Sequence, residues 1–475
     1  MATGEAPSGG TTTSRRGGKR GGARGPRSEP REAKGASAPD PAGLGARESA
    51  VRLVGAVTRA HRSLDEALAK EFASSELAPR DRALARLIAA TTLRRWGELD
   101  SMMASFLEKP LPEGKTGNLW PILLCAAAQL LFLNTPAHAA VGLAVEQARR
   151  DRHAKRYDRL VNALLRRVTR EIAGVREGEH LLRLNFPAWL FNRWSATYGE
   201  DTALAIAQAS LEEAALDLSV KAEPEVWAER LGGVVLPTGS VRLKSGGRVE
   251  ELAGYEDGAW WVQDAAAALP ARLLGVVTGL EVADLCAAPG GKTAELAAAG
   301  AKVTAVEQSG TRMKRLEGNL QRLSLSAEIV EADAATWQPG KTFDAVLVDA
   351  PCTATGTIRR HPDILHLKRE DDIAALAELQ SRLLDNAATL VKPGGMLVYC
   401  TCSLEPEEGE AQIAAFIARA PHFKRVPIRA GEHGIDSAWI TADGDLRTLP
   451  CHLPQEVSGL SGLDGFYAAR LVHSG

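Results

Sequence analysis

Cysteine is scarce in this chain: its 475 residues contain six cysteines, and no two of them are spaced as C-x-x-C. Structural zinc sites usually take their ligands from such pairs, so we expect no metal ion. The cysteine density is also far below that of a disulfide-stabilised secreted domain, which favours a reducing compartment. The six are Cys125, Cys286, Cys352, Cys400, Cys402 and Cys451.

Long apolar runs are missing as well. The most apolar stretch, residues 121–133, is shorter than the roughly 18–20 residues that a membrane-spanning helix needs. The N-terminus carries charges and glycines and has no apolar signal core. The sequence therefore predicts a cytoplasmic protein that makes no membrane contact, and we expect it to be monomeric.

What the chain does contain is an uneven distribution of charge within a formal net charge of −2. Residues 1–47 hold nine Lys or Arg against four Asp or Glu, a local charge of +5, so the remainder carries −7. This segment is rich in Gly, Ser, Pro and Arg and predicts a disordered basic tail. It could bind a polyanion or only increase solubility, and charge alone does not separate these interpretations.

The rest of the chain is too long for one core, which rarely exceeds about 250–300 residues. Over residues 48–178 apolar side chains recur at helical spacing without an alternating strand pattern, which predicts an all-helical domain. Residues 179–260 mix short apolar and polar pieces and predict a linker with a small α+β connector. Its candidate strands are 216–222, 234–237 and 240–244.

The last predicted helix of the helical region lies in a basic run at residues 148–170. Nine Lys or Arg stand there against Asp151 and Asp158. Such a row of cations could follow a phosphate backbone, although a solvated helix face has the same composition. The nine are Arg149, Arg150, Arg152, Lys155, Arg156, Arg159, Arg166, Arg167 and Arg170.

From residue 261 to 475 the pattern alternates between strand and helix. Five apolar segments predict strands, and a long helix is expected near 371–391. The strands are 280–285, 302–307, 327–333, 343–349 and 395–400. This alternation predicts a doubly wound, mostly parallel α/β sheet, and so a multidomain protein that ends in an α/β domain.

The first of these strands leads into a glycine-rich turn, VADLCAAPGGKT at 282–293. Its glycines let the backbone approach a ligand closely, and the helix N-terminus that follows favours anionic groups. Three acids then end or follow successive strands: Glu307, Asp333 and Asp349. Ligands of open α/β sheets bind at the carboxyl ends of strands, where an acid can bind ribose hydroxyls, so we predict a nucleoside pocket.

Two cysteines follow the fourth and fifth predicted strands. Cys352 lies in DAPCTATGTIRRHPD (349–363) and Cys402 in YCTCSLEPEEGE (399–410). Because these strands should be neighbours, both thiols should face one cleft. A cysteine in a loop beside a polar cleft can be an activated nucleophile, whereas lone cysteines are usually inert. The spacing alone does not decide which of the two would attack.

Several strings of the C-terminal half occur together: CAAPGGK at 286–292, DAPC at 349–352, TCS at 401–403, DGFYAARL at 464–471 and VQDAAA at 262–267. As a set they resemble the Sun-type (RsmB) RNA cytosine-5 methyltransferases. VNALLRR at 161–167 and FPAWLFNRW at 186–194 are similar to the NusB-like domain and the linker of that branch. The resemblance implies a Rossmann-like methyltransferase domain after a NusB-like RNA-binding domain, with S-adenosyl-L-methionine as cofactor and small-subunit (16S) rRNA as substrate.

The resemblance also implies roles for the site residues. Cys402 would be the nucleophile that adds to a cytosine, and Cys352 would assist release of the product. Asp349 would hydrogen-bond the cytosine edge, and Lys292 is the nearest auxiliary group that could lower a thiol pKa or hold a phosphate. The implied cofactor contacts are Cys286, Ala287, Ala288, Pro289, Gly290, Gly291, Lys292, Glu307, Asp333 and Asp349, with Arg312 a weaker candidate.

The chain departs from the family pattern in two places. Thr353 stands where serine is common, and Glu307 stands where many relatives have aspartate. The glutamate reaches one methylene further, so a ribose contact shifts without being lost. Arg359, Arg360 and His361 follow the Cys352 loop and could bind phosphates beside an unstacked cytosine, or could simply form a solvated loop.

Several alternatives stay open at this point. A DNA cytosine methyltransferase would use the cysteine of the PC motif as nucleophile and generally lacks TCS. A non-catalytic RNA-binding assembly factor could share the fold, although intact Cys352 and Cys402 argue against it. A transcription antitermination module is a weaker reading of the helical region. The RNA could also be tRNA or 23S rRNA, because the 16S assignment rests on the resemblance alone.

Overall fold

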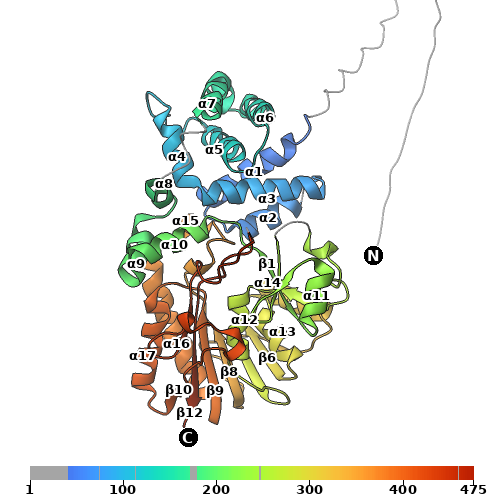
Figure 1. Cartoon of the computed structure of the whole chain (residues 1–475), viewed down its shortest axis with the longest axis vertical. Helices are drawn as coiled ribbons and strands as arrows, with labels where there is room; N and C mark the ends of the chain where they lie inside the picture. Colours follow the sequence, from blue (N-terminus) through green and yellow to red (C-terminus); the bar gives the residue numbers. More distant parts are fainter. Residues whose placement is uncertain (1–40, 74, 113, 172–178, 245–247, 458) are drawn as a thin grey trace, which may run out of the picture. The chain divides into compact units, whose positions relative to one another are not determined.

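The structure is a computed structural model that describes residues 41–475 apart from 74, 113, 172–178, 245–247 and 458 (Figure 1). Residues 41–475 pack as one unit, and the domain boundaries predicted within it stay predictions. Most of the predicted basic tail lies outside the described residues. Its last part is helical rather than disordered, since helix α1 begins at Leu44 and both Leu44 and Ala46 are fully buried.

The N-terminal part is helical, as the periodicity predicts. Its helices are α1 Leu44–Thr58, α2 Leu64–Ala73, α3 Pro79–Arg94, α4 Trp96–Ser105, α5 Leu119–Leu131, α6 Ala137–Arg150, η1 Ala154–Tyr157 and α7 Asp158–Glu171. The most apolar stretch of the chain forms α5, which contacts α1, α3, α4, α6 and α7 and is buried on nearly every side. It is therefore the core helix of this bundle. Within the described part of the chain, no helix is long and apolar enough to cross a membrane.

Three further helices lead into a small antiparallel sheet with the strand order β2-β3-β1-β4. The elements are α8 Glu179–Leu184, α9 Ala188–Tyr198, α10 Glu200–Ser210, β1 Leu216–Val220, α11 Pro224–Leu231, β2 Val234–Val235, β3 Val241–Leu243 and β4 Trp260–Val262. Buried Arg242 on β3 pairs with Asp217 on β1 at 2.6 Å, which links the two strands. This is the predicted α+β connector, although β4 extends past the boundary expected at residue 260.

An eight-stranded sheet forms the C-terminal part, with the order β10-β12-β9-β8-β5-β6-β7 and β11 paired to β12. The strands are β5 Glu281–Leu285, β6 Lys302–Glu307, β7 Glu328–Glu331, β8 Phe343–Asp349, β9 Val391–Thr401, β10 Phe423–Arg425, β11 Leu446–Thr448 and β12 Phe466–His473. β5 to β9 pair in parallel and match the five predicted strands, which confirms the doubly wound sheet. β10, β11 and β12 are antiparallel and were not predicted.

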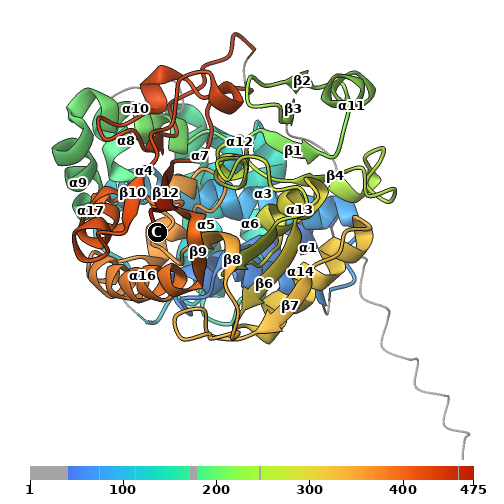
Figure 2. The same ribbon diagram turned by 90° about the horizontal axis from the view of Figure 1, so that it is seen from below.

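Helices cover both faces of this sheet (Figure 2). α16 Asp371–Leu390 and α17 Glu410–Arg419 pack on one face, and α12 Ala265–Arg272, α13 Gly291–Ala298 and α14 Gly310–Arg322 pack on the other. The chain order reverses between the neighbours β5 and β8: β5 continues to β6 and β7 on one side, and β8 continues to β9 on the other. Ligands of such sheets bind beyond the carboxyl ends of the strands at this reversal, which is where the predicted site residues lie.

Candidate active site

The loop 286–292 leaves β5 at the reversal point and turns into α13. Cys286 and Gly290 adopt left-handed backbone conformations, with φ of 65° and 102°. A side chain at Gly290 would be strained by this left-handed φ, and its Cβ would lie 2.4 Å from Cδ1 of Leu316 on α14, so that leucine would have to move. The glycine therefore fixes the path of the loop at the carboxyl end of β5.

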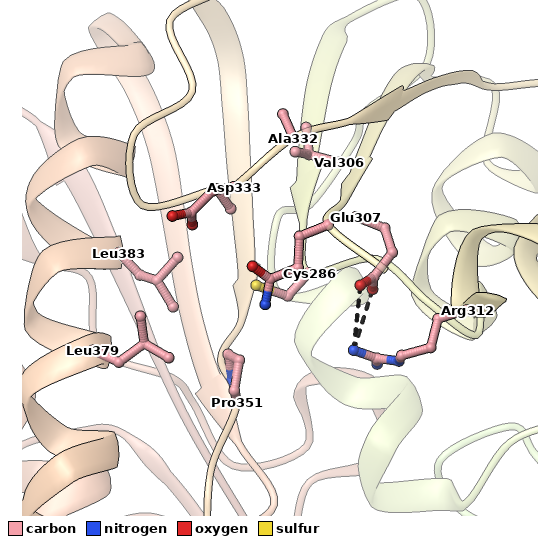
Figure 3. Close-up of a pocket in the computed structure, with 11 residues that line it drawn as sticks. Cys286, Val306, Glu307, Arg312, Ala332, Asp333, Pro351, Leu379 and Leu383 are labelled. Atoms are coloured by element: carbon pink, nitrogen blue, oxygen red, sulfur yellow. Dashed lines mark hydrogen bonds and ion pairs between the residues drawn. The ribbon is translucent and has the colours of Figure 1, made fainter. Parts of the chain in front are cut away.

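A small pocket lies beside this loop (Figure 3). Glu307 and Asp333 lie on either side of Cys286, while Leu379 and Leu383 face the pocket from α16. The lining residues are Cys286, Val306, Glu307, Gln308, Arg312, Ala332, Asp333, Ala334, Pro351, Leu379 and Leu383. The pocket thus combines two acids with apolar walls.

Both acids of the pocket are held in a fixed orientation. Glu307 is 2% exposed, and its Oε1 accepts a hydrogen bond from the backbone N–H of Ser309 at 2.9 Å. The guanidinium of Arg312 lies 3.2 Å from Oε2 of the same carboxylate. Asp333 accepts a hydrogen bond from the backbone N–H of Ala335 at 2.9 Å. Oriented carboxylates with apolar walls fit a nucleoside, whose ribose hydroxyls donate and whose base needs an apolar slot.

Lys292 pairs with Asp349 across the strand ends. Its Nζ donates to Oδ2 of Asp349 at 2.7 Å and lies 4.9 Å from the ring centre of Phe466 on β12. Burial acts to lower the pKa of Lys292, but Asp349 and Cys400 raise it above its ordinary value. The lysine is therefore charged, and its ammonium group is committed to orienting Asp349. Burial and Asp349 raise the pKa of the neighbouring Cys400 thiol, while the charge of Lys292 acts to lower it. The auxiliary role expected of Lys292 stays a prediction.

Asp284 on β5 is a further acid of the site that the sequence reasoning missed. It is fully buried, and its Oδ2 accepts a hydrogen bond from Oγ1 of Thr293 at 2.6 Å. Burial raises the pKa of Asp284 to about 7, with the charge of Asp349 acting in the same direction. Acids with such raised pKa values gather at functional sites. Its position inside the glycine-rich string was the signal that could have identified it.

Cys352 and Cys402 meet as the strand order predicts, with their Sγ atoms 3.5 Å apart. They follow β8 and β9, which pair in parallel with Asp349 opposite Cys400. Both cysteines are half-buried. The contact with Cys402, together with burial, raises the pKa of the Cys352 thiol well above its usual value. The two thiols therefore form one unit beside the Lys292–Asp349 pair.

The loop after Cys352 contains the arginines that were expected to bind phosphates. Arg359 is 3% exposed, and its guanidinium lies 3.2 Å from Asp264 and 3.5 Å from Asp464. Arg360 also pairs with Asp464. The predicted phosphate contact is therefore wrong for Arg359, whose charge is neutralised inside the protein. Burial also lowers the pKa of His361, which favours its neutral form.

The basic run at 148–170 spans α6, η1 and α7. Its nine cations are exposed except for Arg167, which is half-buried. The apolar side of α7 faces the bundle core. Arg149 and Arg167 pair with acids of their own neighbourhood, Asp158 and Glu171, at 3.0 and 2.7 Å. The run is therefore a surface on which a polyanion could lie.

The fold and the pocket define the class of this protein: it is an S-adenosylmethionine-dependent methyltransferase. Comparison with known proteins gives the family. The model of the 16S rRNA methyltransferase RsmB/F family matches residues 271–472, and that of the NusB family matches residues 44–170. The chain belongs to the RsmB/F family, which confirms the resemblance noted in its sequence.

Individual relatives cover nearly the whole chain. A ribosomal RNA small subunit methyltransferase B of Vibrio cholerae is 37% identical over 84% of this chain and 91% of its own. A protein of the same name from Vibrio vulnificus is 35% identical over 90% of this chain and 99% of its own. The crystal structure of PH0851 superposes with a TM-score of 0.70 over 92% of this chain and 100% of that one, at 26% identity.

The cofactor of this class, S-adenosylmethionine, suits the pocket described above. Its ribose needs acceptors such as Glu307, which is fixed at the end of β6, and its adenine needs apolar walls such as Leu379 and Leu383. Among the described residues, no group of three or more His, Cys, Asp or Glu is arranged to hold a metal ion.

Proposed function

We propose that this protein methylates carbon 5 of a cytosine in small-subunit (16S) rRNA through a covalent bond between Cys402 and the base. The observation that carries the proposal is the 3.5 Å contact between the thiols of Cys352 and Cys402. The backbone links this pair to the cofactor pocket, because Pro351, which lines that pocket, precedes Cys352 directly. The names of the curated relatives support ribosomal RNA as the substrate.

Cys402 supplies the nucleophile. Carbon 5 of cytosine is a poor nucleophile, and addition of the Cys402 thiolate to carbon 6 gives it enamine character. S-adenosylmethionine, when bound, supplies the methyl group as an electrophilic sulfonium. Afterwards the proton on carbon 5 passes to a base, the carbon–sulfur bond breaks, and Cys402 leaves as a thiolate while the ring double bond re-forms.

Cys352 and Asp349 assist this chemistry. The raised pKa of Cys352 keeps it protonated, so its thiol can donate to the sulfur of Cys402 as that sulfur leaves carbon 6. Asp349, whose carboxylate is oriented by Lys292, accepts hydrogen bonds from the cytosine edge. Addition of the anionic thiolate leaves negative charge on the ring; a proton taken up from solvent at ring nitrogen 3 neutralises it, and the Asp349 carboxylate accepts a hydrogen bond from that N–H.

We assign the cofactor to the loop 286–292 together with Glu307, Asp333 and Asp349. Glu307 and Asp333 accept hydrogen bonds from the nucleoside part, and the loop backbone approaches the remainder closely because Gly290 carries no side chain. The exposed cations of residues 148–170 bind the RNA backbone.

Bisulfite sequencing of RNA from cells with and without this protein tests the proposal. We expect one unconverted cytosine of 16S rRNA to become convertible when the protein is absent. The wild-type gene should restore protection, and a Cys402→Ala gene should not. Loss of a tRNA or 23S rRNA site instead would replace the substrate, and no change in any RNA would overturn the reaction.

A further inference from the structure

Glu408 is a buried acid in the loop that follows Cys402, and the chemistry above gives it no role. It ends the 3-10 turn η5 Pro406–Glu408 and is 0% exposed. A carboxylate removed from water is costly unless hydrogen bonds replace the lost hydration. Four neutral donors from three residues provide them here: the backbone N–H and hydroxyl of Thr353, the hydroxyl of Ser403 and the amide of Gln380.

One group of these contacts fixes the Cys352 loop. Thr353, the residue after Cys352, donates its backbone N–H to Oε1 of Glu408 at 3.0 Å and its hydroxyl to Oε2. Nε2 of Gln380 on α16 donates to the same Oε1 at 3.0 Å and to the carbonyl oxygen of Pro351 at 2.8 Å. The residues on both sides of Cys352 are therefore held by Glu408, one directly and one through Gln380.

A second group fixes the Cys402 loop. Ser403, the residue after Cys402, donates its hydroxyl to Oε2 of Glu408 at 2.6 Å. The backbone carbonyl of Glu408 accepts hydrogen bonds from the hydroxyl of Tyr399 at 2.8 Å and from that of Thr401 at 3.3 Å. Glu408 thus contacts the residues before and after Cys402 as well.

We infer that Glu408 is a positioning residue that joins the Cys352 and Cys402 loops and sets the contact between their thiols. It acts through Thr353 and Ser403, not on the substrate. The inference rests on the proposed function, because it explains how the nucleophile and the group that assists its release are kept in contact. The charge of Glu408 also contributes, after Cys402 and burial, to the raised pKa of Cys352, so the same residue helps to keep that thiol protonated.

The chemistry of the four donors makes Glu408→Gln informative. Glutamine keeps the shape of the side chain but replaces one acceptor oxygen with an amide NH₂ group. An NH₂ group that faces donors loses those hydrogen bonds, so at least one cysteine loop must move. The control is Glu378→Gln, the same substitution at an exposed position of α16, the helix that carries Gln380.

The experiment uses the full-length protein with S-adenosylmethionine and a transcript of small-subunit rRNA. We expect Glu408→Gln to lower kcat at least about tenfold, because small displacements of reacting groups have effects of this size, and to leave KM for S-adenosylmethionine unchanged. It should also accumulate a protein–RNA adduct that survives denaturing gels, as Cys352→Ala should. Glu378→Gln should match the wild type in both measurements.

Thr353 provides a second, milder pair of variants if Glu408→Gln fails to fold. Thr353→Val removes the hydroxyl that donates to Glu408 and keeps the volume, whereas Thr353→Ser keeps the hydroxyl. We expect the valine variant to lose kcat and accumulate adduct, and the serine variant to behave as the wild type. Equal behaviour of the two would overturn the inference.

The denaturing gel distinguishes a failure of the positioning role of Glu408 from a failure of the release role of Cys352. If Cys352→Ala accumulates adduct but Glu408→Gln and Thr353→Val turn over and release product normally, Glu408 has no positioning role. If Cys352→Ala forms no adduct, the release role of Cys352 is overturned, and the kcat of Glu408→Gln then decides the positioning role alone.

Discussion

The cofactor side and the cysteine side of the site are built in different ways. The cofactor side is local: Glu307 is held by Ser309 and Arg312, and Gly290 packs on Leu316. These residues come from the ends of two successive strands, β5 and β6, and from the helix α14. Nothing in these contacts requires the N-terminal helices.

The cysteine side is held from far along the chain. Arg193 on α9 pairs with Glu405, in the loop after Cys402, at 2.7 Å. In the segment after Cys352, the carbonyl of Arg359 accepts a hydrogen bond from Arg94 at 2.9 Å.

Two further contacts hold the same segment. Asp363 accepts a hydrogen bond from the backbone N–H of Leu64 at 2.9 Å. Nε2 of His366 lies 2.9 Å from the carbonyl of Leu93. Cofactor binding thus depends on the sheet and its own helices, whereas the alignment of the thiols also depends on helices that precede the sheet. Substitutions should therefore change cofactor affinity and turnover separately.

Cys402→Ser should give the largest difference between the loss of methyl transfer and the loss of cofactor affinity. A serine hydroxyl stays protonated at neutral pH, so methyl transfer should fall by at least about 10³-fold. The affinity for S-adenosylmethionine should not change, because Cys402 does not line the cofactor pocket. Tritium transfer and isothermal titration calorimetry measure the two quantities. Cys451→Ser, at a half-buried cysteine outside the pair, is the control, and transfer near the wild-type rate would remove Cys402 from its role.

Glu307→Gln should do the opposite of Cys402→Ser: it should lower cofactor affinity and leave the kcat measured at saturating cofactor nearly unchanged. Hydrogen bonds to a charged group contribute about 1.5–3 kcal/mol, so the affinity for S-adenosylmethionine should fall roughly 10- to 100-fold. With saturating cofactor, kcat should recover to near the wild-type value. Glu331→Gln, at the exposed end of β7, is the matched control. Unchanged affinity would show that the cofactor is bound elsewhere.

Arg193→Ala tests the remote support of the cysteine side. It leaves buried Glu405 without its cation, so the loop after Cys402 should shift and kcat should fall about tenfold at unchanged cofactor affinity. Arg183→Ala, which removes a more exposed ion pair with Glu200, should have little effect. A parallel loss of cofactor affinity in Arg193→Ala would mean that the two sides are not separable.

The last comparison concerns the pH dependence of stability on the cofactor side. The folded state holds the Asp284 proton up to a pKa of about 7, whereas the unfolded chain loses it near the ordinary value of 3.8. This stabilisation is complete at low pH and is lost as pH rises through 7, by up to about 1.4 kcal/mol per pH unit. Asp284→Asn cannot ionise, so its Tm should depend less on pH between 4 and 7. Parallel Tm curves for the two proteins would contradict the raised pKa.

The sequence predicts the parts of the molecule that local patterns encode. β5, β6 and β8 are apolar runs that end in turns, and the neighbouring strands β8 and β9 bring Cys352 and Cys402 together as expected. Strands β10 and β11 have three residues each, too few to show alternation. β12 was noted as a string typical of the family without being assigned as a strand.

The burial of Arg359 could not be predicted, because its partners Asp264 and Asp464 are 95 and 105 residues away in the chain. An arginine beside a reactive loop has the same local sequence whether it faces RNA or a carboxylate. The hydrogen bonds of Glu408 to Thr353 and Gln380 also span loops distant in sequence, although its place in the string around Cys402 was visible.

The position of β12 has a consequence for how the protein is made. β9, which ends beside Cys402, pairs with β8 on one side and with β12 on the other. Translation proceeds from the N-terminus, so β9 emerges before residues 466–473 exist and waits with one edge unpaired. Unpaired edges recruit strands from other chains. The nascent methyltransferase therefore exposes this pairing edge during the interval between synthesis of β9 and of β12.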